Sequence, residues 1–170
     1  AEEMITSQDL HISGFIKDLM RPCIIVMNKF DLVSADQKEK ILEEISEKFN
    51  HIPKIPILLT SALKEINIDK IIPMAIEVYE NSIKRVAQKE LNSCFIDAIS
   101  KKQPASKGKK SPEIFSISQY KISPPGFKFE SHNYDLIHFS YKRYLENKIR
   151  ERFDFSGCPI SLRFVKGKRR

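Results

Sequence analysis

The 170-residue sequence predicts an α/β fold in its first half and an α+β fold in its second half. In the first half, short apolar runs alternate with helical patterns, an order typical of a parallel sheet covered by helices. The charge also changes along the chain, because residues 1–80 carry 9 Lys and Arg against 14 Asp and Glu, whereas residues 81–170 carry 20 against 8. This asymmetry predicts two units with different partners, the second partner being a polyanion.

The first half begins with a predicted helix. Thr6 and Ser7 are potential N-cap residues, and apolar residues recur with helical spacing from Leu10 to Leu19. The run Cys23–Met27 follows, and it is short, apolar and partly β-branched. These properties predict a strand that is buried on both faces.

A second helix is predicted from Ser34, which has the spacing of a capping box with Gln37. Pro56–Thr60 (PILLT) then predicts a second buried strand. Asn67 or Asp69 can cap a third helix, whose apolar side chains at residues 68–79 lie on one face. The alternation of strands and helices with short links predicts a parallel sheet.

The second half has a different pattern, and we place the domain boundary between residues 85 and 86. The basic stretch Lys101–Lys110 (KKQPASKGKK) contains Pro and Gly and predicts a loop or linker. Around it, the periodicities predict helix, strand, strand, helix and strand over residues 91–99, 115–120, 127–130, 141–153 and 160–164.

In this half, the periodicity also predicts which side chains share a face of a strand or a helix. In the first predicted strand, Phe115 and Ile117 alternate with polar residues, so they are expected to share a face. In the helix at 141–153, the apolar stripe leaves four basic residues on the other faces, namely Lys142, Arg143, Lys148 and Arg150.

The run Cys23–Met27 ends abruptly at Asn28-Lys29-Phe30-Asp31, which has the pattern Asn-Lys-x-Asp. Open α/β sheets bind ligands beyond the carboxyl ends of their strands. A carboxylate at Asp31 can accept hydrogen bonds from N1–H and the exocyclic amine of guanine, a donor pair that adenine lacks. The Asn28 amide can contact the base edge and brace neighbouring loops, and the Lys29 stem can lie on the base face. The pattern therefore predicts guanine recognition.

A second segment supports this interpretation. The strand PILLT runs into Ser61, Ala62 and Leu63, where a backbone N–H can receive the guanine carbonyl. The alternative is that the three fixed residues of Asn-Lys-x-Asp occur here by chance. Asn and Asp are common in turns, so they can follow a strand without binding a ligand. Guanine recognition is favoured because both segments directly follow predicted buried strands.

These segments resemble the bacterial tandem GTPase family Der, also called EngA, which joins two GTPase domains to a KH-like domain. CIIVMNKFDL and TSAL resemble its base-recognition motifs, and ITSQDLHISGFI resembles the stretch after switch II of its second GTPase domain. ISPPGFKF and SYKRYLENKIRERFDFSGCPISLRF resemble its KH-like domain. The last match separates the chain from Era-like GTPases, the nearest alternative family, and the resemblance covers nearly the whole chain.

The resemblance implies that residues 1–85 are the C-terminal part of a P-loop GTPase domain and residues 86–170 a KH-like domain. It implies GTP or GDP as ligand, with Mg²⁺ only in a full-length protein. It also implies a role in assembly of the large ribosomal subunit, with rRNA and the missing N-terminal G domains of the same protein as partners.

The sequence departs from the family in its phosphate-binding groups. The loop G-x-x-x-x-G-K-[ST], the switch Thr and an Asp-x-x-Gly segment ahead of the base-recognition motifs, which cradle the phosphates and hold Mg²⁺, are absent. We therefore expect a fragment of a longer GTPase that is inactive alone and contributes no catalytic residue. The alternatives are an rRNA-binding module that needs no nucleotide and an inactive remnant of a broken gene.

Two basic clusters are candidate RNA contacts, because flexible cations suit phosphate groups. Their members are Lys101, Lys102, Lys107, Lys109, Lys110, Lys166, Lys168, Arg169 and Arg170. The alternative is a solvated basic surface that aids solubility. Residues 81–170 contain no Gly-x-x-Gly, the loop with which KH domains clamp a single strand, so sequence-specific RNA recognition is not expected.

The composition disfavours several other classes of protein. No apolar run approaches the ~20 residues that span a membrane, and the acidic start lacks the features of a signal peptide. The three cysteines and four histidines have no metal-ligand spacing, and the odd cysteine number does not suit a disulfide framework. We therefore expect a cytoplasmic protein with no membrane partner and no metal held by this chain.

Overall fold

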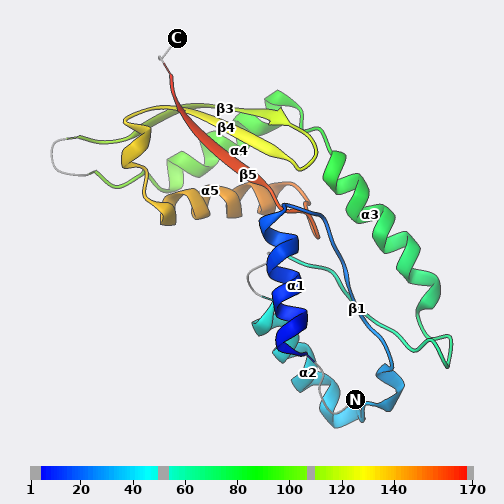
Figure 1. Cartoon of the computed structure of the whole chain (residues 1–170). Coiled ribbons are helices and arrows are strands. Elements are labelled where there is room, and N and C mark those ends of the chain that lie inside the picture. The colour runs from blue at the N-terminus through cyan, green and yellow to red at the C-terminus, as the bar shows by residue number, and fades with distance from the viewer. Residues whose placement is uncertain (1–4, 50–53, 107–109, 168–170) are drawn as a thin grey trace. The chain divides into compact units, whose positions relative to one another are not determined.

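The computed structural model describes residues 5–49, 54–106 and 110–167 (Figure 1). It divides into two compact units. The first contains the chain up to Ser82 together with Phe155–Pro159, and the second contains residues 83–154 and 160–170. The division falls close to the predicted boundary, but no local pattern predicted that Phe155–Pro159 would join the first unit. Within the described ranges, no helix is long and apolar enough to cross a membrane.

The first unit is built around two parallel strands. Ile25 lies opposite Ile57 in the pairing of β1 with β2, and the chain crosses between the strands through α2. This confirms the predicted parallel sheet with helices. In chain order the elements are α1 (Ser7–Asp18), β1 (Ile25–Met27), the 3-10 helix η1 (Phe30–Leu32), α2 (Ala35–Lys48), β2 (Ile57–Leu59), the 3-10 helix η2 (Ile68–Lys70) and α3 (Ile71–Ile83).

Side-chain caps determine where α1 and α2 begin. The backbone N–H of Asp9 donates to Oγ1 of Thr6 at 3.3 Å, and the backbone N–H of Thr6 donates to the Asp9 carboxylate at 2.9 Å. In α2, the backbone N–H of Ser34 donates to the side-chain oxygen of Gln37 at 3.3 Å. Each cap satisfies a backbone donor that the helix itself leaves unpaired, which stabilises the helix by about 1 kcal/mol. The capping box predicted for α2 is confirmed.

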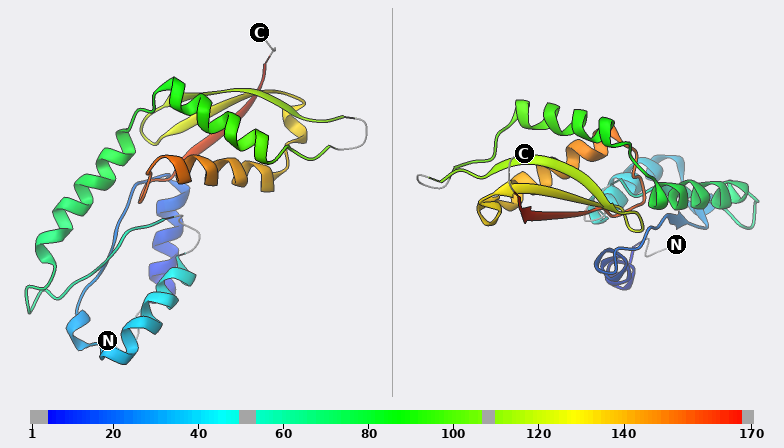
Figure 2. Two further views of the ribbon diagram at one scale, coloured as in Figure 1. Left: turned by 180° about the vertical axis from the view of Figure 1, so that it is seen from behind. Right: turned by 90° about the horizontal axis from the view of Figure 1, so that it is seen from above.

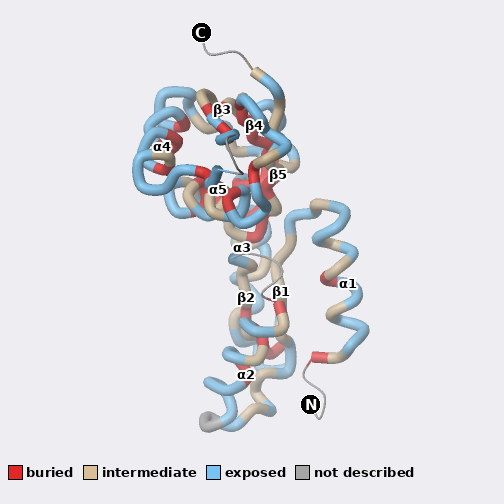
Figure 3. Tube along the Cα trace, turned by 90° about the vertical axis from the view of Figure 1, so that its left-hand side faces the viewer, coloured by how far each residue is buried: buried red, intermediate tan, exposed pale blue. Residues whose placement is uncertain are grey.

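Helix α2 contributes two buried side chains to the main core cluster of this unit. Its residues Ile41 and Ile45 are buried together with Phe49, and the apolar side chains of β1 and β2 pack against them. The helical spacing of apolar residues predicted α1 and α3 correctly, but many of these apolar side chains are not buried. Phe15 is 67% exposed and Ile72 is 66% exposed, and Figure 3 shows α1 largely exposed. The reason is that α2 covers the core side of a sheet only two strands wide.

The segment Phe155–Pro159 is held in the first unit by backbone hydrogen bonds. The N–H of Cys23 donates to the carbonyl of Gly157 at 2.9 Å, and the N–H of Gly157 donates to the carbonyl of Lys54 at 3.0 Å. The Cys158 thiol, which is buried, donates to the carbonyl of Val78 at 3.4 Å. Gly157 has φ +70°, a left-handed conformation that favours glycine.

The second unit is a three-stranded sheet with two helices, and it has the predicted order of elements. Strands β3 and β4 pair antiparallel, and β4 and β5 pair parallel, with Phe129 opposite Phe164. The elements are α4 (Gln88–Lys101), β3 (Glu113–Lys121), β4 (Gly126–His132), the 3-10 helix η3 (Tyr134–Leu136), α5 (Phe139–Arg152) and β5 (Ser161–Lys166). Figure 2 shows α4 and α5 on one side of this sheet. Phe129 stacks on Phe164 at 4.9 Å between ring centroids and meets Phe95 of α4 at 6.2 Å.

Two expectations for this unit were wrong. Phe115 does not share a face with Ile117, because the register shifts between Ile114 and Ser116, and Ile114 and Ile117 are the buried pair. Such a bulge inserts an extra residue and reverses the alternation beyond it. Arg150 is only 4% exposed and its Nε donates to Glu146 at 2.9 Å, so it does not lie on the solvated side of α5.

Candidate functional site

The two predicted base-recognition segments lie at the same edge of the β1–β2 sheet. Asn28 follows β1 and Ser61 follows β2 at the carboxyl ends of the two parallel strands. Backbone hydrogen bonds continue past the strand ends, because Thr60 N–H donates to the carbonyl of Met27 and Phe30 N–H donates to the carbonyl of Thr60, both at 2.9 Å. The two segments are therefore brought together, at the position where open sheets bind ligands.

The Asn28 amide connects these segments directly. The backbone N–H of Ala62 donates to Oδ1 of Asn28 at 3.1 Å. This hydrogen bond gives Asn28 a bracing position. It also engages one of the three backbone N–H groups, at Ser61, Ala62 and Leu63, that were candidates for binding the guanine carbonyl. Lys29 has φ +62°, so the chain turns sharply between Asn28 and Asp31. The contact of these residues with guanine stays a prediction.

Asp31 lies in η1 and is held by Ser61. The hydrogen bond from the Ser61 side chain is the main cause that lowers the pKa of the Asp31 carboxyl below its usual value. Ser61 is buried, and its hydroxyl oxygen also accepts the backbone N–H of Lys64 at 3.2 Å. A Ser hydroxyl can accept through a lone pair and donate its proton at the same time, so Ser61 accepts from Lys64 while donating to the Asp31 carboxylate. Asp31 is thus ionised at neutral pH and retains acceptor capacity for a ligand.

Asn67, one of the two N-cap candidates for the third helix, also supports the site, a role that the sequence did not predict. Its Nδ2 donates to the carbonyl of Leu59 at 2.9 Å, and its φ is +57°. Ser61 and Ile66 exchange backbone hydrogen bonds at 3.0 and 3.1 Å, which closes the loop after β2. The sequence could have indicated a tight turn at this position, because Asn adopts the left-handed conformation more often than most residues do.

The edge is open to a planar ligand. Leu63 is 88% exposed, and Lys29 and Ala62 are also exposed. The arrangement can present one carboxylate and an amide to a flat polar molecule, with the Lys29 stem beside it. Among the described residues, no group of three or more His, Cys, Asp or Glu side chains could hold a metal ion.

The candidate RNA contacts are dispersed over the second unit. Lys101 ends α4 and Lys166 ends β5, and both are exposed, as are Lys102 and Lys110. Lys107, Lys109, Lys168, Arg169 and Arg170 lie outside the described residues. The described members therefore do not form one compact patch at a single element.

A cluster of charged side chains around α4 and α5 was predicted only in part, because Lys101 and Lys102 were candidate RNA contacts and Lys148 was not. Lys102 and Lys148 lie over the Tyr144 ring, at 5.4 and 5.8 Å from its centroid, and the Tyr144 hydroxyl donates to the carbonyl of Ala98 at 2.8 Å. A cavity of about 210 Å³ beside them is lined by both basic and acidic side chains, namely Lys101, Lys148, Arg152, Asp97 and Glu151. Lys148 forms an ion pair with Glu151. The spacing of four between Tyr144 and Lys148 could have indicated the pair, because such residues are neighbours on a helix.

Comparison with known proteins gives a consistent result. Residues 85–164 match a family model described as the KH-domain-like region of EngA bacterial GTPase enzymes, C-terminal. The chain is 38% identical over 170 residues to GTPase Der of Clostridium botulinum strain Langeland, covering 99% of this chain and 39% of that protein. It is 34% identical over 166 residues to GTPase Der of Symbiobacterium thermophilum, covering 96% of this chain and 35% of that protein.

A solved structure of Aquifex aeolicus Era bound to GDP and AlF₄⁻ is 20% identical with a TM-score of 0.37, covering 95% of this chain and 60% of that one. That likeness is too low to carry an argument. The sequence matches are extensive, and the chain spans about two fifths of the length of the curated relatives. The chain belongs to the GTPase Der family, and it corresponds to the C-terminal part of those proteins.

Proposed function

We propose that this chain carries the guanine-recognition edge and the RNA-binding unit of a Der-type GTPase that acts in assembly of the large ribosomal subunit. Residues 1–85 would be the C-terminal part of a G domain, and residues 86–170 would be the KH-like domain. The observation that carries the proposal is the hydrogen bond from Ala62 to Asn28, which joins the two base-recognition segments beside an ionised Asp31.

The edge suits guanine in its chemistry. The Asp31 carboxylate accepts from N1–H and the exocyclic amine, while Ser61 holds the carboxylate in place. The Asn28 amide meets the base edge, and the Lys29 stem lies on its face. GTP or GDP would bring the phosphates and Mg²⁺ to groups in the remainder of a longer protein, and hydrolysis would take place there.

The first prediction is that a polypeptide of residues 1–170 does not hydrolyse GTP. Its sequence has no phosphate-binding loop, so the transferring phosphoryl group has no electrostatic stabilisation. Phosphate release should equal that of buffer in a malachite-green assay. Release above buffer that disappears in Asp31→Ala would contradict the prediction.

The second prediction concerns the basic half. The chain should retain RNA at low salt and lose it steeply as salt rises, because Lys and Arg displace counterions from the phosphates. Between about 50 and 200 mM salt, a protein with several phosphate contacts loses about 10³-fold or more in affinity. Filter binding over a salt series measures the slope. No retention at the lowest salt would exclude the RNA-binding part of the proposal.

A second candidate function is an RNA-binding module that works without nucleotide. It is favoured by the excess of basic residues in residues 81–170. The native protein, immunopurified from its source cells, separates the candidates. Co-purification of large-subunit rRNA that responds to GTP but not ATP supports the GTPase. Equal rRNA recovery with and without GTP supports the module, and recovery of no rRNA contradicts both.

A further inference from the structure

One face of the β3–β4–β5 sheet is left uncovered by α4 and α5 (Figure 2). On β4, Phe127 and Phe129 are buried toward the helices, so Lys128 and Glu130 lie on the opposite face. We call this surface the open sheet face, and it contains Phe115, Ser116, Ser118, Tyr120, Lys128, Glu130, His132 and Arg163. Ser118 and Arg163 belong to it because each is the direct partner of Lys128 across the sheet.

Two aromatic rings lie against the backbone on this face, one at each end of β3. A Cβ at Gly126 would lie 2.9 Å from Cε1 and Cζ of Tyr120, and a Cβ at Gly167 would lie 3.0 Å from Cε2 of Phe115. The two glycines therefore make room for the rings. The Tyr120 hydroxyl is 3.3 Å from Oγ of Ser161, yet the residue remains 45% exposed.

The second ring is supported from the side. His132, which is exposed, meets Phe115 edge-on with 4.9 Å between ring centroids. The register shifts of β3 at Phe115 and Tyr120 lie opposite Glu130 and Gly126 of β4, and these two residues are four positions, or about 13 Å, apart. The open sheet face thus presents two anchored aromatic surfaces with a short gap between them.

Cations occupy that gap. Lys128 Nζ lies 3.0 Å from Glu130, and the same carboxylate accepts the Ser116 hydroxyl at 3.2 Å. Arg163 is exposed, and no described carboxylate lies within ion-pair distance of it. The gap therefore offers an exposed guanidinium and a partly neutralised lysine, with the hydroxyl of Ser118 beside them.

We propose that the open sheet face binds a short single-stranded RNA, with bases stacked on Tyr120 and Phe115 and the intervening phosphates on Arg163 and Lys128. Stacking requires exposed base faces, which a single strand offers and a duplex does not. The charge is complementary, since residues 81–170 carry 20 basic against 8 acidic residues. This inference rests on the proposed RNA partner, and it identifies a surface that works without a Gly-x-x-Gly clamp.

Binding of a fluorescein-labelled single-stranded RNA of about eight nucleotides to the full chain tests the proposal. Fluorescence anisotropy at low salt should give about tenfold weaker binding for Tyr120→Leu and for Phe115→Leu, because each removes one stacking surface. Tyr120→Phe retains the ring and should bind like the unmodified chain. Arg163→Gln should lower the slope of log affinity against log salt by about one.

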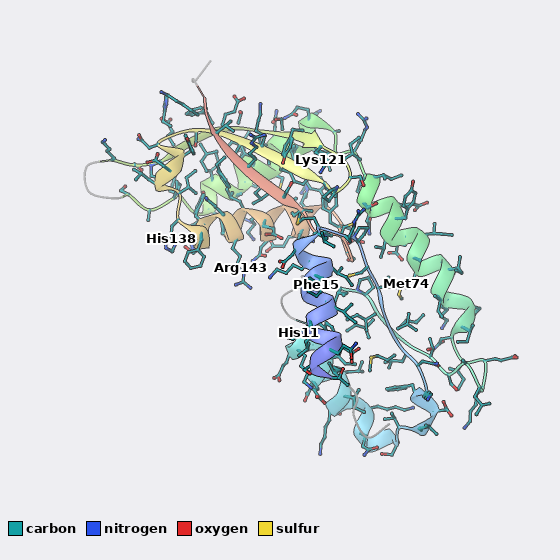
Figure 4. All side chains as sticks on the ribbon, in the orientation of Figure 1. His11, Phe15, Met74, Lys121, His138 and Arg143 are labelled. Atoms are coloured by element: carbon teal, nitrogen blue, oxygen red, sulfur yellow. The ribbon has the colours of Figure 1, made fainter. Side chains whose placement is uncertain are left out.

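Matched controls use the helix side of the same unit. Phe139 is 71% exposed at the start of α5, and Arg143 projects from α5 away from the sheet (Figure 4). Phe139→Leu and Arg143→Gln remove the same groups from α5, and their effects should be smaller than those of Tyr120→Leu and Arg163→Gln. Circular dichroism checks that each variant is folded, and UV crosslinking of 4-thiouridine RNA gives an independent readout by locating crosslinks on β3 or on α5.

The outcomes separate this inference from the proposed function. If the unmodified chain binds no RNA, both fail. If it binds RNA but crosslinks to α5 and is weakened only by Phe139→Leu or Arg143→Gln, the open sheet face is overturned and RNA binding stands. Equal binding of duplex RNA overturns stacking. Equal binding of single-stranded DNA assigns the surface to single strands of both kinds. RNA affinity unchanged in a Tyr120→Leu, Phe115→Leu double variant overturns the proposal and leaves the face to a protein partner.

Discussion

Asp31→Asn should lower the affinity of the full-length protein for GTP by about 10³-fold or more. The amide replaces one carboxylate acceptor with an N–H donor, which then faces the N–H groups of guanine. The side chain keeps its shape, and an amide oxygen can still accept the hydrogen bond from Ser61 that holds the carboxylate. Titration of the full-length protein with a fluorescent GTP analogue measures the effect.

The same variant has a rescue that separates recognition from folding. Xanthine carries a carbonyl where guanine carries its exocyclic amine, so an amide donor at residue 31 complements it. Xanthosine triphosphate should therefore bind Asp31→Asn better than GTP does. Asp69→Asn, an equivalent change at an exposed residue of η2, is the matched control and should leave GTP binding intact. Unchanged GTP affinity in Asp31→Asn would remove the guanine assignment.

Gly157→Ala should destabilise the first unit by roughly 2–4 kcal/mol. The left-handed conformation alone costs an alanine about 1–2 kcal/mol, since φ is +70°. The added Cβ would also lie 2.6 Å from Cγ2 of Val78 and 2.8 Å from the carbonyl oxygen of Cys23. The carbonyl is backbone and cannot rotate away, so the hydrogen bonds of Gly157 with Cys23 and Lys54 would be strained.

Amide hydrogen exchange measures this loss locally. Protection should fall at Cys23 and Gly157, whose N–H groups make the hydrogen bonds that the substitution strains. Gly14→Ala provides the matched control, because a Cβ there has nothing within 4 Å and Gly14 lies inside α1. That change should stabilise the unit by about 0.5–1 kcal/mol. Equal protection in the two variants would show that the contacts around Gly157 contribute little to stability.

Local patterns in the sequence predicted much of the fold. The capping box of Ser34 and Gln37, the apolar run before Asn28 and the stripe of α5 each depend on neighbours in the chain, so their structures follow from short-range chemistry. The same holds for the placement of Asn28 and Ser61 at one edge, because parallel strands bring their carboxyl ends together.

The sequence by itself therefore determined the element order, the family and the residues of the candidate guanine edge. Only the tertiary structure decided which side chains are paired or covered. The bulge at Phe115 placed that ring on the open sheet face. The buried Arg150 donates a hydrogen bond to Glu146, and the Ala62 N–H donates one to the side-chain oxygen of Asn28. The tertiary structure also placed Phe155–Pro159, and Gly157 with it, in the first unit, whereas the chain on either side of this segment belongs to the second. These outcomes depend on contacts between distant residues, which hydrophobic periodicity along one chain does not encode.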